Sequence, residues 1–327
     1  MAGPFARPQK PGGIIEAMVK IWIAHDTGLD ALRAEARAVA PAAEVVVELM
    51  PAPEELPSDP AGVAFWVPPF LAKPELTVLA ERMPDLRVVQ LLSAGADAWT
   101  GRLPAAVTLC DARGVHDSST AEWVVGVILS YVRDLPLFAR AQERGEWAYR
   151  RTDELAGKRV LIVGSGSIGR AVEARLAPFE VPVTRVARRP REGVHGVEEL
   201  PRLLPDADVV VLLVPLTAQT RGLVDAAFLS HLRDGALLVN AARGPVVDTA
   251  AVTAEALTGR IGFATDVTDP EPLPSDHALW RLPNVLITPH VAGSVPAVFS
   301  RGYALAAAQL RRFLTGAPLE NVVTEGY

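Results

Sequence analysis

Two series of short apolar runs, each long enough for one β-strand, dominate the sequence. The first begins with KIWIAH at 20–25 and continues at 44–50, 63–68, 88–93 and 106–110. The second begins with KRVLIVG at 158–164 and continues at 183–187, 208–214, 236–241, 261–265 and 285–288. Helix-length segments separate the runs, and this alternation is typical of parallel sheets covered on both faces. We therefore predict two doubly wound α/β domains, a number that also suits 327 residues.

Composition and charge narrow the class of partner. The chain has no apolar run of about 18 residues that would predict a membrane span. Its formal charge is -6 and it has no block of Lys and Arg, which argues against a nucleic-acid surface. The single cysteine, Cys110, lies in an apolar run, cannot form an internal disulfide and suits a reducing cytoplasm. No cluster of residues has the spacing of a metal site. We therefore expect a cytoplasmic protein with a small-molecule partner.

Three features suggest where the domains begin and end. Residues 1–17 contain three prolines and three glycines and lack the apolar core of a signal peptide, so we expect a disordered extension or a misassigned start before Met18. A long apolar helix follows Ser119 and Glu122, which have capping-box spacing, and we expect it to bridge the domains. A second helix at 295–315 is expected to return to the first domain. The predicted boundaries are 18–116 with 299–327 for the first domain, and 117–298 for the second.

A glycine-rich turn begins the second domain. The strand KRVLIVG ends in GSGSIG, with glycines at 164, 166 and 169, and the helix RAVEARL follows. Glycines without side chains let the backbone approach a pyrophosphate, and the helix N-terminus offers unpaired N–H groups. A tight turn with no ligand is the alternative, but the strand before the loop and the helix after it favour a dinucleotide site.

These motifs together resemble the D-2-hydroxyacid dehydrogenases, which act on D-isomers with a nicotinamide cofactor. The resemblance runs from Val19 through nearly the whole chain. It rests on GSGSIG, VPLTAQTRGLVD at 214–225, LLVNAARGPVVD at 237–248, DVTDPEPLP at 266–274 and LPNVLITPHVAGS at 282–294. It implies a flavodoxin-like substrate domain, a Rossmann dinucleotide-binding domain, an active site in the cleft between them, and a homodimer. The family's catalytic arginine, glutamate and histidine fall on Arg243, Glu271 and His290.

The resemblance also implies the residues that contact cofactor and substrate. The cofactor set is Gly164, Gly166, Ser167, Ile168, Gly169, Arg188, Arg189, Val214, Pro215, Ala241, Ala242, Asp266, His290 and Gly293. The substrate set is Arg243 with the loop Ser93, Ala94 and Gly95, whose backbone N–H groups are expected to bind the substrate carboxylate. Asp266 is expected near the nicotinamide. Among the remaining histidines, His116 is the one we expect nearest the cleft.

Reduction of a 2-oxo acid needs a proton donor, a group that orients the donor, and a group that binds the substrate carboxylate. A histidine suits the general acid, so we assign that role to His290. A carboxylate beside it would fix the ring and favour the imidazolium form, which is the role predicted for Glu271. The planar fork of Arg243 can bind the carboxylate and stabilise the developing alkoxide. Taken singly, such residues are usually solvated or cap a sheet edge, but their joint spacing favours function.

The predicted cofactor preference rests on the end of the second strand of this fold. NAD-preferring members place an acidic residue there, roughly 20 residues beyond the glycines, to bind the ribose 2′-OH. That position falls on Ala187, and Arg188 and Arg189 follow at once, with Arg191 close behind. A solvated basic turn is the alternative. The lost acid and the added arginines favour NADP(H), while NAD(H) stays possible.

The predicted function is an oxidoreductase that reduces glyoxylate, hydroxypyruvate or a similar 2-oxo acid to the D-hydroxy acid. The physiological direction and the substrate's side chain are left open. One alternative is a D-3-phosphoglycerate dehydrogenase-like enzyme, although no regulatory domain is expected after ENVVTEGY. Another is an NAD(H)-sensing, corepressor-like binding protein. Formate dehydrogenases resemble the chain but carry glutamine where Glu271 stands, so they are disfavoured.

Overall fold

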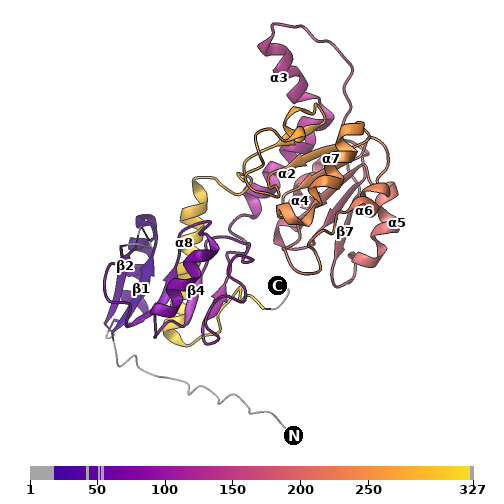
Figure 1. Ribbon diagram of the computed structural model, residues 1–327. Helices are drawn as coiled ribbons and strands as arrows, with labels where there is room; N and C mark the ends of the chain where they lie inside the picture. The colour runs from indigo at the N-terminus through magenta and orange to yellow at the C-terminus, as the bar shows by residue number, and fades with distance from the viewer. Residues whose placement is uncertain (1–17, 42–43, 51, 53–54, 325–327) are drawn as a thin grey trace. The chain divides into compact units, whose positions relative to one another are not determined.

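The computed structural model describes residues 18–41, 44–50, 52 and 55–324 (Figure 1). The described residues up to Val115, together with those from Pro296 onward, form one compact unit, and His116–Val295 form a second. The prediction for residues 1–17 therefore lies outside the described residues. The chain crosses between the units near residues 116 and 296, and each unit has its own sheet.

The first unit is built on a five-stranded parallel sheet. Its strands are β1 (Val19–Ile23), β2 (Val45–Leu49), β3 (Val63–Val67), β4 (Val88–Gln90) and β5 (Thr108–Cys110). Their spatial order is β2-β1-β3-β4-β5, which is the flavodoxin-like order of doubly wound sheets. All five predicted strands are present, and the predicted flavodoxin-like fold is confirmed.

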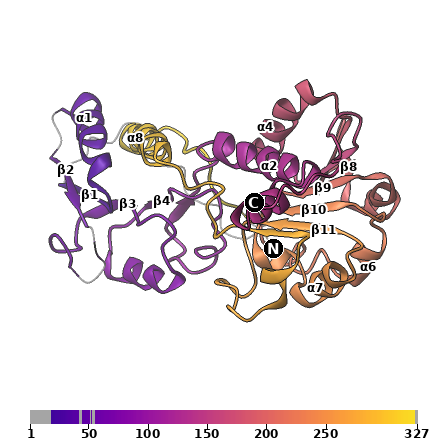
Figure 2. The same cartoon turned by 90° about the horizontal axis from the view of Figure 1, so that it is seen from above.

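Both faces of this sheet are covered. Helices α1 (Leu29–Val39) and α8 (Ala297–Thr315) pack side by side on one face (Figure 2). The other face carries a tryptophan-rich core and the 3₁₀ segment Pro74–Arg82. Cys110 is fully buried, and burial raises the pKa of its thiol to about 12. Cys110 is therefore buried, as its place in an apolar run indicates.

The second unit is built on a seven-stranded parallel sheet. Its strands are β6 (Val160–Val163), β7 (Val183–Ala187), β8 (His195–Gly196), β9 (Val209–Leu212), β10 (Leu237–Asn240), β11 (Gly262–Thr265) and β12 (Val285–Ile287). Their order is β12-β11-β10-β9-β6-β7-β8, the order of a Rossmann fold with one added edge strand. Only the two-residue β8 was not predicted. The strand order reverses between β6 and β9, where such sheets bind ligands.

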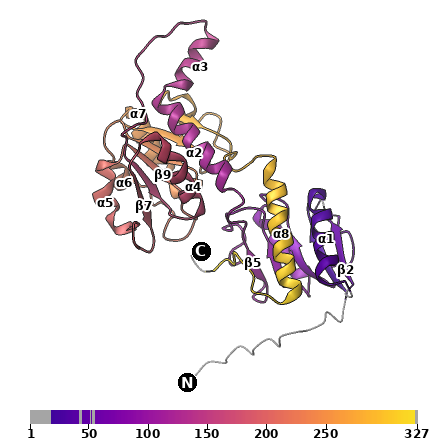
Figure 3. The same ribbon diagram turned by 180° about the vertical axis from the view of Figure 1, so that it is seen from behind.

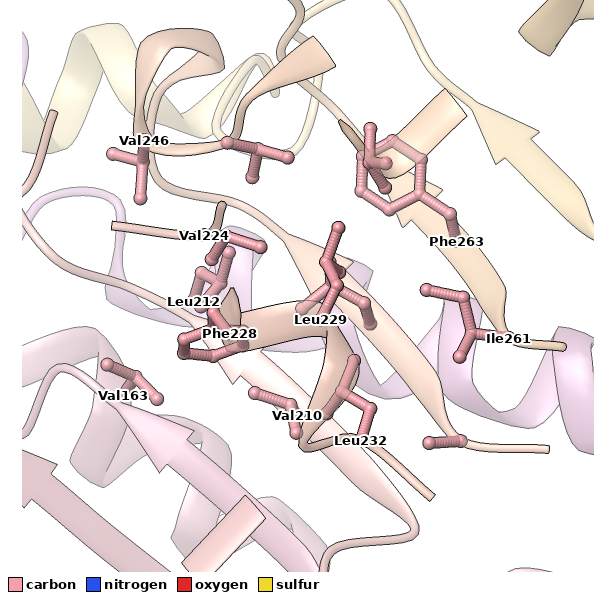
Figure 4. Close-up of a cluster of buried hydrophobic side chains, with 14 of the residues drawn as sticks. Val163, Val210, Leu212, Val224, Phe228, Leu229, Leu232, Val246, Ile261 and Phe263 are labelled. Atoms are coloured by element: carbon pink, nitrogen blue, oxygen red, sulfur yellow. The ribbon is translucent and has the colours of Figure 1, made fainter. Parts of the chain in front are cut away.

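Helices cover both faces of the second sheet as well. Figure 2 shows α2 (Asp117–Val132) and α4 (Ser167–Leu176) on one face, and α6 (Ala226–Ser230) and α7 (Thr249–Thr258) on the other. The short α5 (Leu200–Leu203) belongs to the second of these layers. Figure 4 shows part of the core on this side, where Phe228 and Leu229 of α6 lie among strand residues such as Val210 and Leu212.

The prediction of one long helix with a capping box was wrong about its N-terminal cap and about its length. The N-cap of α2 is His116 and makes no side-chain cap, because Ser119 lies inside the helix and its Oγ donates to the His116 carbonyl. The helix then ends at Val132, and Asp134 has a left-handed φ of 53° before α3 (Leu135–Glu143) begins. A proline is not tolerated in a helix interior, so Pro136 falls in the first turn of a new helix. Both helices belong to the second unit.

Candidate active site

The strand register brings the predicted site residues of the second unit to one edge of its sheet. Parallel pairing aligns the last residues of five strands, Val163, Leu212, Asn240, Thr265 and Ile287, in a single row with Val186, the last residue but one of β7. The residues that follow this row are Ala187, Gly164, Leu213, Ala241, Asp266 and Thr288. The carboxyl ends of six strands therefore present the predicted cofactor loop and the loops of the predicted catalytic residues along one edge.

The glycine loop is shaped by close backbone contacts. Gly164 has φ +121°, and a Cβ there would lie 2.5 Å from the Leu213 carbonyl at the end of β9. A Cβ on Gly169 would lie 2.2 Å from the carbonyl oxygen of Gly164. Side chains at these two positions would collide with backbone, so the turn between β6 and α4 requires glycine.

Gly166 is not enclosed by backbone as Gly164 and Gly169 are. It is the N-cap of α4, and no described atom lies within 4 Å of the position that its Cβ would take. The space beside the helix N-terminus is therefore open on the side where a Cβ would stand. Exposed N–H groups and the positive end of a helix suit a phosphate, so the loop fits a dinucleotide pyrophosphate.

The other predicted cofactor residues in this unit lie at the neighbouring strand ends. Val214 and Pro215 follow β9, and the Val214 nitrogen is 2.9 Å from where a Gly164 Cβ would stand. Ala241 and Ala242 follow β10, and the Ala241 nitrogen donates to the Leu212 carbonyl. Ser167 and Ile168 begin α4, and the Ser167 hydroxyl bonds to Asp117.

The end of β7 has the features expected of a site without an acidic residue. Ala187 is the last residue of the strand, directly after Val186, whose carbonyl accepts from the Gly164 nitrogen. Arg188 and Arg189 follow it and are exposed. The three residues at the strand end, 187–189, therefore provide no carboxylate.

His290 and Glu271 form a hydrogen-bonded pair. The Nδ1 atom of His290 lies 2.7 Å from Oε1 of Glu271, and the two side chains are 29% and 44% exposed. His290 has a left-handed φ of 55°, a conformation uncommon in residues other than glycine. The contact leaves Nε2 as the ring nitrogen available to a substrate.

A buried carboxylate holds the loop that carries His290. Asp266 is 3% exposed, and its Oδ1 accepts hydrogen bonds from the Thr288 hydroxyl and the Val291 nitrogen, while Oδ2 accepts from Ala292. Its carbonyl accepts from the His290 nitrogen at 2.7 Å. The described contacts thus give Asp266 a structural role, and its expected contact with the nicotinamide stays a prediction.

Two polar residues that the sequence reasoning missed complete this arrangement. The Thr288 hydroxyl also accepts from the indole nitrogen of Trp123 on α2, at 3.0 Å. Asn240 is fully buried, and its side chain bonds to the Ala242 nitrogen and the Arg243 carbonyl. Its carbonyl accepts from the Asp266 nitrogen. The sequence signal for Asn240 and Thr288 was a polar residue at the end of an apolar strand, in LLVNAA and VLITPH respectively.

Arg243 lies in the loop after β10. Its Nη1 donates to the Ala242 carbonyl, and the guanidinium is partly exposed. The next residue, Gly244, packs so closely that a Cβ would lie 1.9 Å from the carbonyl oxygen of Thr268. The loop of Arg243 is therefore in direct contact with the segment that leads to Glu271.

The remaining predicted residues occupy two further loops. Gly293 packs against the buried ring of His116, whose Nδ1 is 3.3 Å from the Gly293 carbonyl. In the first unit, Ser93, Ala94 and Gly95 follow β4, and the Ser93 hydroxyl donates to the Gly95 carbonyl. Binding of a substrate carboxylate by this loop stays a prediction.

No group of three or more His, Cys, Asp or Glu side chains is arranged to hold a metal ion within the part of the chain that the structure describes. In the same residues, no helix combines the length and apolar character needed to cross a membrane.

Comparison with known proteins identifies the family. The model of the D-isomer specific 2-hydroxyacid dehydrogenase NAD-binding domain matches residues 125–292. A chloroplastic/mitochondrial formate dehydrogenase of Arabidopsis thaliana is 34% identical over 76% of this chain and 69% of its own. A glyoxylate reductase of Thermofilum pendens is also 34% identical, over 71% and 73%.

A solved structure agrees with these matches over nearly the full length. It is a D-isomer specific 2-hydroxyacid dehydrogenase from Xanthobacter autotrophicus Py2 in complex with NADPH and MES. The two chains are 34% identical, with a TM-score of 0.80 and coverage of 95% of this chain and 100% of the other. The chain belongs to the D-isomer-specific 2-hydroxyacid dehydrogenase family, and the predicted class of NAD(P)-dependent oxidoreductase is confirmed.

Proposed function

We propose that this protein reduces a small 2-oxo acid, such as glyoxylate or hydroxypyruvate, to the D-2-hydroxy acid, with NADPH as the favoured cofactor. The observation that carries the proposal is the 2.7 Å pair of His290 and Glu271, at the sheet edge that also presents the glycine loop. A relative named glyoxylate reductase supports this substrate class.

His290 is the proton donor of the proposed reaction. Glu271 accepts from Nδ1, so the imidazolium proton that can be transferred is the one on Nε2. The left-handed backbone of His290 and its hydrogen bond to the Asp266 carbonyl fix the point from which the ring projects. The hydrogen bond to Glu271 limits the rotation of the ring.

Arg243 is the proposed carboxylate clamp. Its planar guanidinium has five N–H donors, and Nη1 donates to the Ala242 carbonyl. The fork can bind a carboxylate and also polarise the adjacent carbonyl oxygen as charge develops there. The Gly244 contact with Thr268 holds this loop against the segment leading to Glu271.

A bound dinucleotide would supply the hydride to the carbonyl carbon. The residues proposed to hold it are the glycine loop, the start of α4 and the segments after β9 and β10. We infer a preference for NADPH because Ala187 provides no carboxylate, while Arg188 and Arg189 supply positive charge where a 2′-phosphate would project. The NADPH complex of the Xanthobacter relative supports this preference.

Formate is a poorer match to the predicted chemistry, although formate dehydrogenases are among the relatives. Oxidation of formate transfers a hydride and releases carbon dioxide, so no proton has to be delivered to a carbonyl oxygen. A carboxylate bonded to Nδ1 of His290 orients the ring for proton transfer from Nε2, a task that formate oxidation does not have. Glu271 therefore favours a 2-oxo acid.

The decisive experiment measures absorbance loss of NADPH and NADH with a panel of 2-oxo acids. We expect turnover with glyoxylate or hydroxypyruvate, at a higher kcat/KM with NADPH. Formate with NAD⁺ and with NADP⁺ is the control and should give no reduced cofactor. Tight dinucleotide binding without turnover of any 2-oxo acid would instead support the sensor alternative, and 3-phosphohydroxypyruvate tests the phosphoglycerate alternative.

We also propose that two copies associate through the second unit and that the enzyme acts in the cytoplasm. Figures 1 and 3 show α3 and the segment after it extending from the rest of this unit. That segment exposes Trp147 and Tyr149 by 96% and 84%, an arrangement unfavourable in water. A groove of about 690 Å³, lined in part by Tyr131 and Leu137, lies beside it. A second copy fits because it brings the same aromatic segment to the same groove.

Light scattering tests the association. The unmodified chain should have the mass of a dimer, and replacement of Trp147 and Tyr149 by serine should give a monomer at the same concentration. Val78→Ser, which removes an exposed apolar side chain of the first unit, is the control and should stay dimeric. A dimer that survives the double replacement would show that another surface joins the copies.

A further inference from the structure

An arginine of the turn after β7 is bonded to the glycine loop. Nη2 of Arg191 lies 3.0 Å from the Ser165 carbonyl oxygen and 3.1 Å from its hydroxyl. Ser165 is buried and stands between Gly164 and Gly166. One guanidinium nitrogen thus joins the turn after β7 to the glycine loop, which is proposed to hold the pyrophosphate.

The backbone of Arg191 is also fixed. Its nitrogen donates to the Val194 carbonyl, and the Val194 nitrogen donates back, at 3.0 and 2.8 Å. Gly193 has φ +70° and supplies the left-handed residue of this tight turn. Both ends of a long, flexible side chain are therefore held before any ligand binds.

Arg191 differs in this from the other arginines nearby. Arg185 in β7 is ion-paired with Glu173 of α4 at 3.2 Å, which offsets its charge. Arg188 and Arg189 follow the strand directly and are exposed. Within the described residues no carboxylate forms an ion pair with Arg191, so no ion pair offsets its positive charge beside the loop.

We propose that Arg191 binds the 2′-phosphate of NADPH and that Ser165 positions it to do so. The inference rests on the proposed NADPH preference and identifies the residues responsible. In this fold the ribose 2′ position lies at the end of the second strand of the dinucleotide-binding sheet, which is β7 here, and the residue there, Ala187, has only a methyl side chain. Nη2 donates to Ser165, and Nη1 makes a longer contact of 3.4 Å with the Arg189 carbonyl. A guanidinium held in place binds a phosphate with less loss of side-chain entropy.

This arrangement makes the contribution of Ser165 specific to the phosphate. Ser165→Ala removes one of the two Ser165 oxygens that orient Arg191 and keeps the carbonyl, whereas NADH, which has no 2′-phosphate, does not engage the guanidinium. Arg191→Ala removes the ligand itself. The two replacements should therefore be non-additive in NADPH affinity and nearly silent in NADH affinity.

The test measures Kd for NADPH and for NADH by titration calorimetry on the full-length protein without substrate. We expect Arg191→Ala to weaken NADPH binding about 10- to 100-fold, the size of a charged hydrogen bond, and to change NADH binding less than about twofold. Ser165→Ala should weaken NADPH binding about threefold to tenfold. The double variant should be no weaker than Arg191→Ala alone. Arg233→Ala is the control. It removes an equal charge just before β10, at the amino ends of the strands, and should change neither Kd.

The outcomes separate this inference from the one on which it rests. Equal Kd values for both cofactors in the unmodified protein would overturn the NADPH preference and this inference with it. A preference that survives in Arg191→Ala and Ser165→Ala would overturn only the role of these two residues and leave Arg188 and Arg189 as its source. Equal weakening of NADH and NADPH would show that Arg191 merely supports the loop. Arg191→Lys should recover only part of the preference, and full recovery would exclude the fixed fork.

Discussion

Thr288 donates a 2.6 Å hydrogen bond from its hydroxyl to Oδ1 of Asp266. The same hydroxyl accepts from Trp123, so a side chain of α2 is linked through Thr288 to the carboxylate that holds the His290 loop. These partly buried bonds act on the position of the imidazole without contact to the substrate. A change at Thr288 should therefore affect the catalytic step more than binding.

Replacing Thr288 by valine tests this link. The isosteric change leaves the Trp123 donor and one Asp266 oxygen short of a partner, each worth about 1–3 kcal/mol when buried. We expect a lower melting temperature and a kcat reduced about tenfold, with the Kd for NADPH unchanged. Thr288→Ser keeps the hydroxyl and should retain most of the kcat. A valine variant with normal kcat would show that the His290 loop is held without Thr288.

His290→Asn should abolish general acid catalysis while preserving the fold. Asparagine tolerates the left-handed backbone that His290 adopts, so little strain is added. Because general acid catalysis contributes about 10²- to 10⁴-fold, kcat should fall by that range at an unchanged Kd for NADPH. Stopped-flow single-turnover rates, together with the cofactor Kd, check this. A near-normal rate would remove His290 from the mechanism.

Arg243→Ala should raise KM for the 2-oxo acid and also lower kcat, because the guanidinium is proposed to touch both the carboxylate and the reacting carbonyl. One lost charged hydrogen bond corresponds to about a 10- to 150-fold loss of kcat/KM. Arg243→Lys is the matched variant and should recover only part of it, since lysine lacks the fork. Full recovery by lysine would mean that a point charge suffices.

Burial around His25 predicts a pH dependence of stability. Burial lowers the pKa of His25 from 6.5, and the neighbouring Asp26 carboxylate opposes this shift only in part. The Tyr303 hydroxyl accepts from the His25 nitrogen and lies 3.0 Å from Nδ1, where it can donate to the neutral ring. The unfolded chain therefore binds a proton at a higher pH than the folded protein, and stability is lost as pH falls below about 6.5.

His25→Gln should reduce that dependence. Between pH 8 and pH 5, the melting temperature of the unmodified protein should fall more than that of the variant, because glutamine does not titrate. His231→Gln changes an exposed histidine and should behave like the unmodified protein. Parallel melting curves for all three proteins would show that His25 does not couple to folding.

The sequence predicted the elements better than it predicted the contacts between loops. Near-continuous apolar runs mark buried parallel strands, so both sheets were predicted. The break between α2 and α3 was missed because the apolar pattern continues across Asp134, while the left-handed backbone there depends on local geometry. The pairing of His290 with Glu271 was predicted from family spacing. The bond between Arg191 and Ser165 was not, because it joins two turns 26 residues apart through one rotamer.

The glycine loop supplies a matched pair of replacements that separates folding from cofactor binding. A Cβ at position 169 would lie 2.2 Å from the Gly164 carbonyl oxygen, so Gly169→Ala must displace α4 from β6. At position 166 the space is open among the described residues, and the backbone φ of -80° suits alanine. If the pyrophosphate lies against Gly166, the added methyl group occupies its place.

We expect Gly169→Ala to lower the melting temperature of the cofactor-free protein. Gly166→Ala should leave that temperature within about 1–2 °C, because a surface change is usually worth less than 0.5 kcal/mol, and weaken NADPH binding at least about tenfold. Unchanged NADPH affinity in Gly166→Ala would place the pyrophosphate away from this glycine.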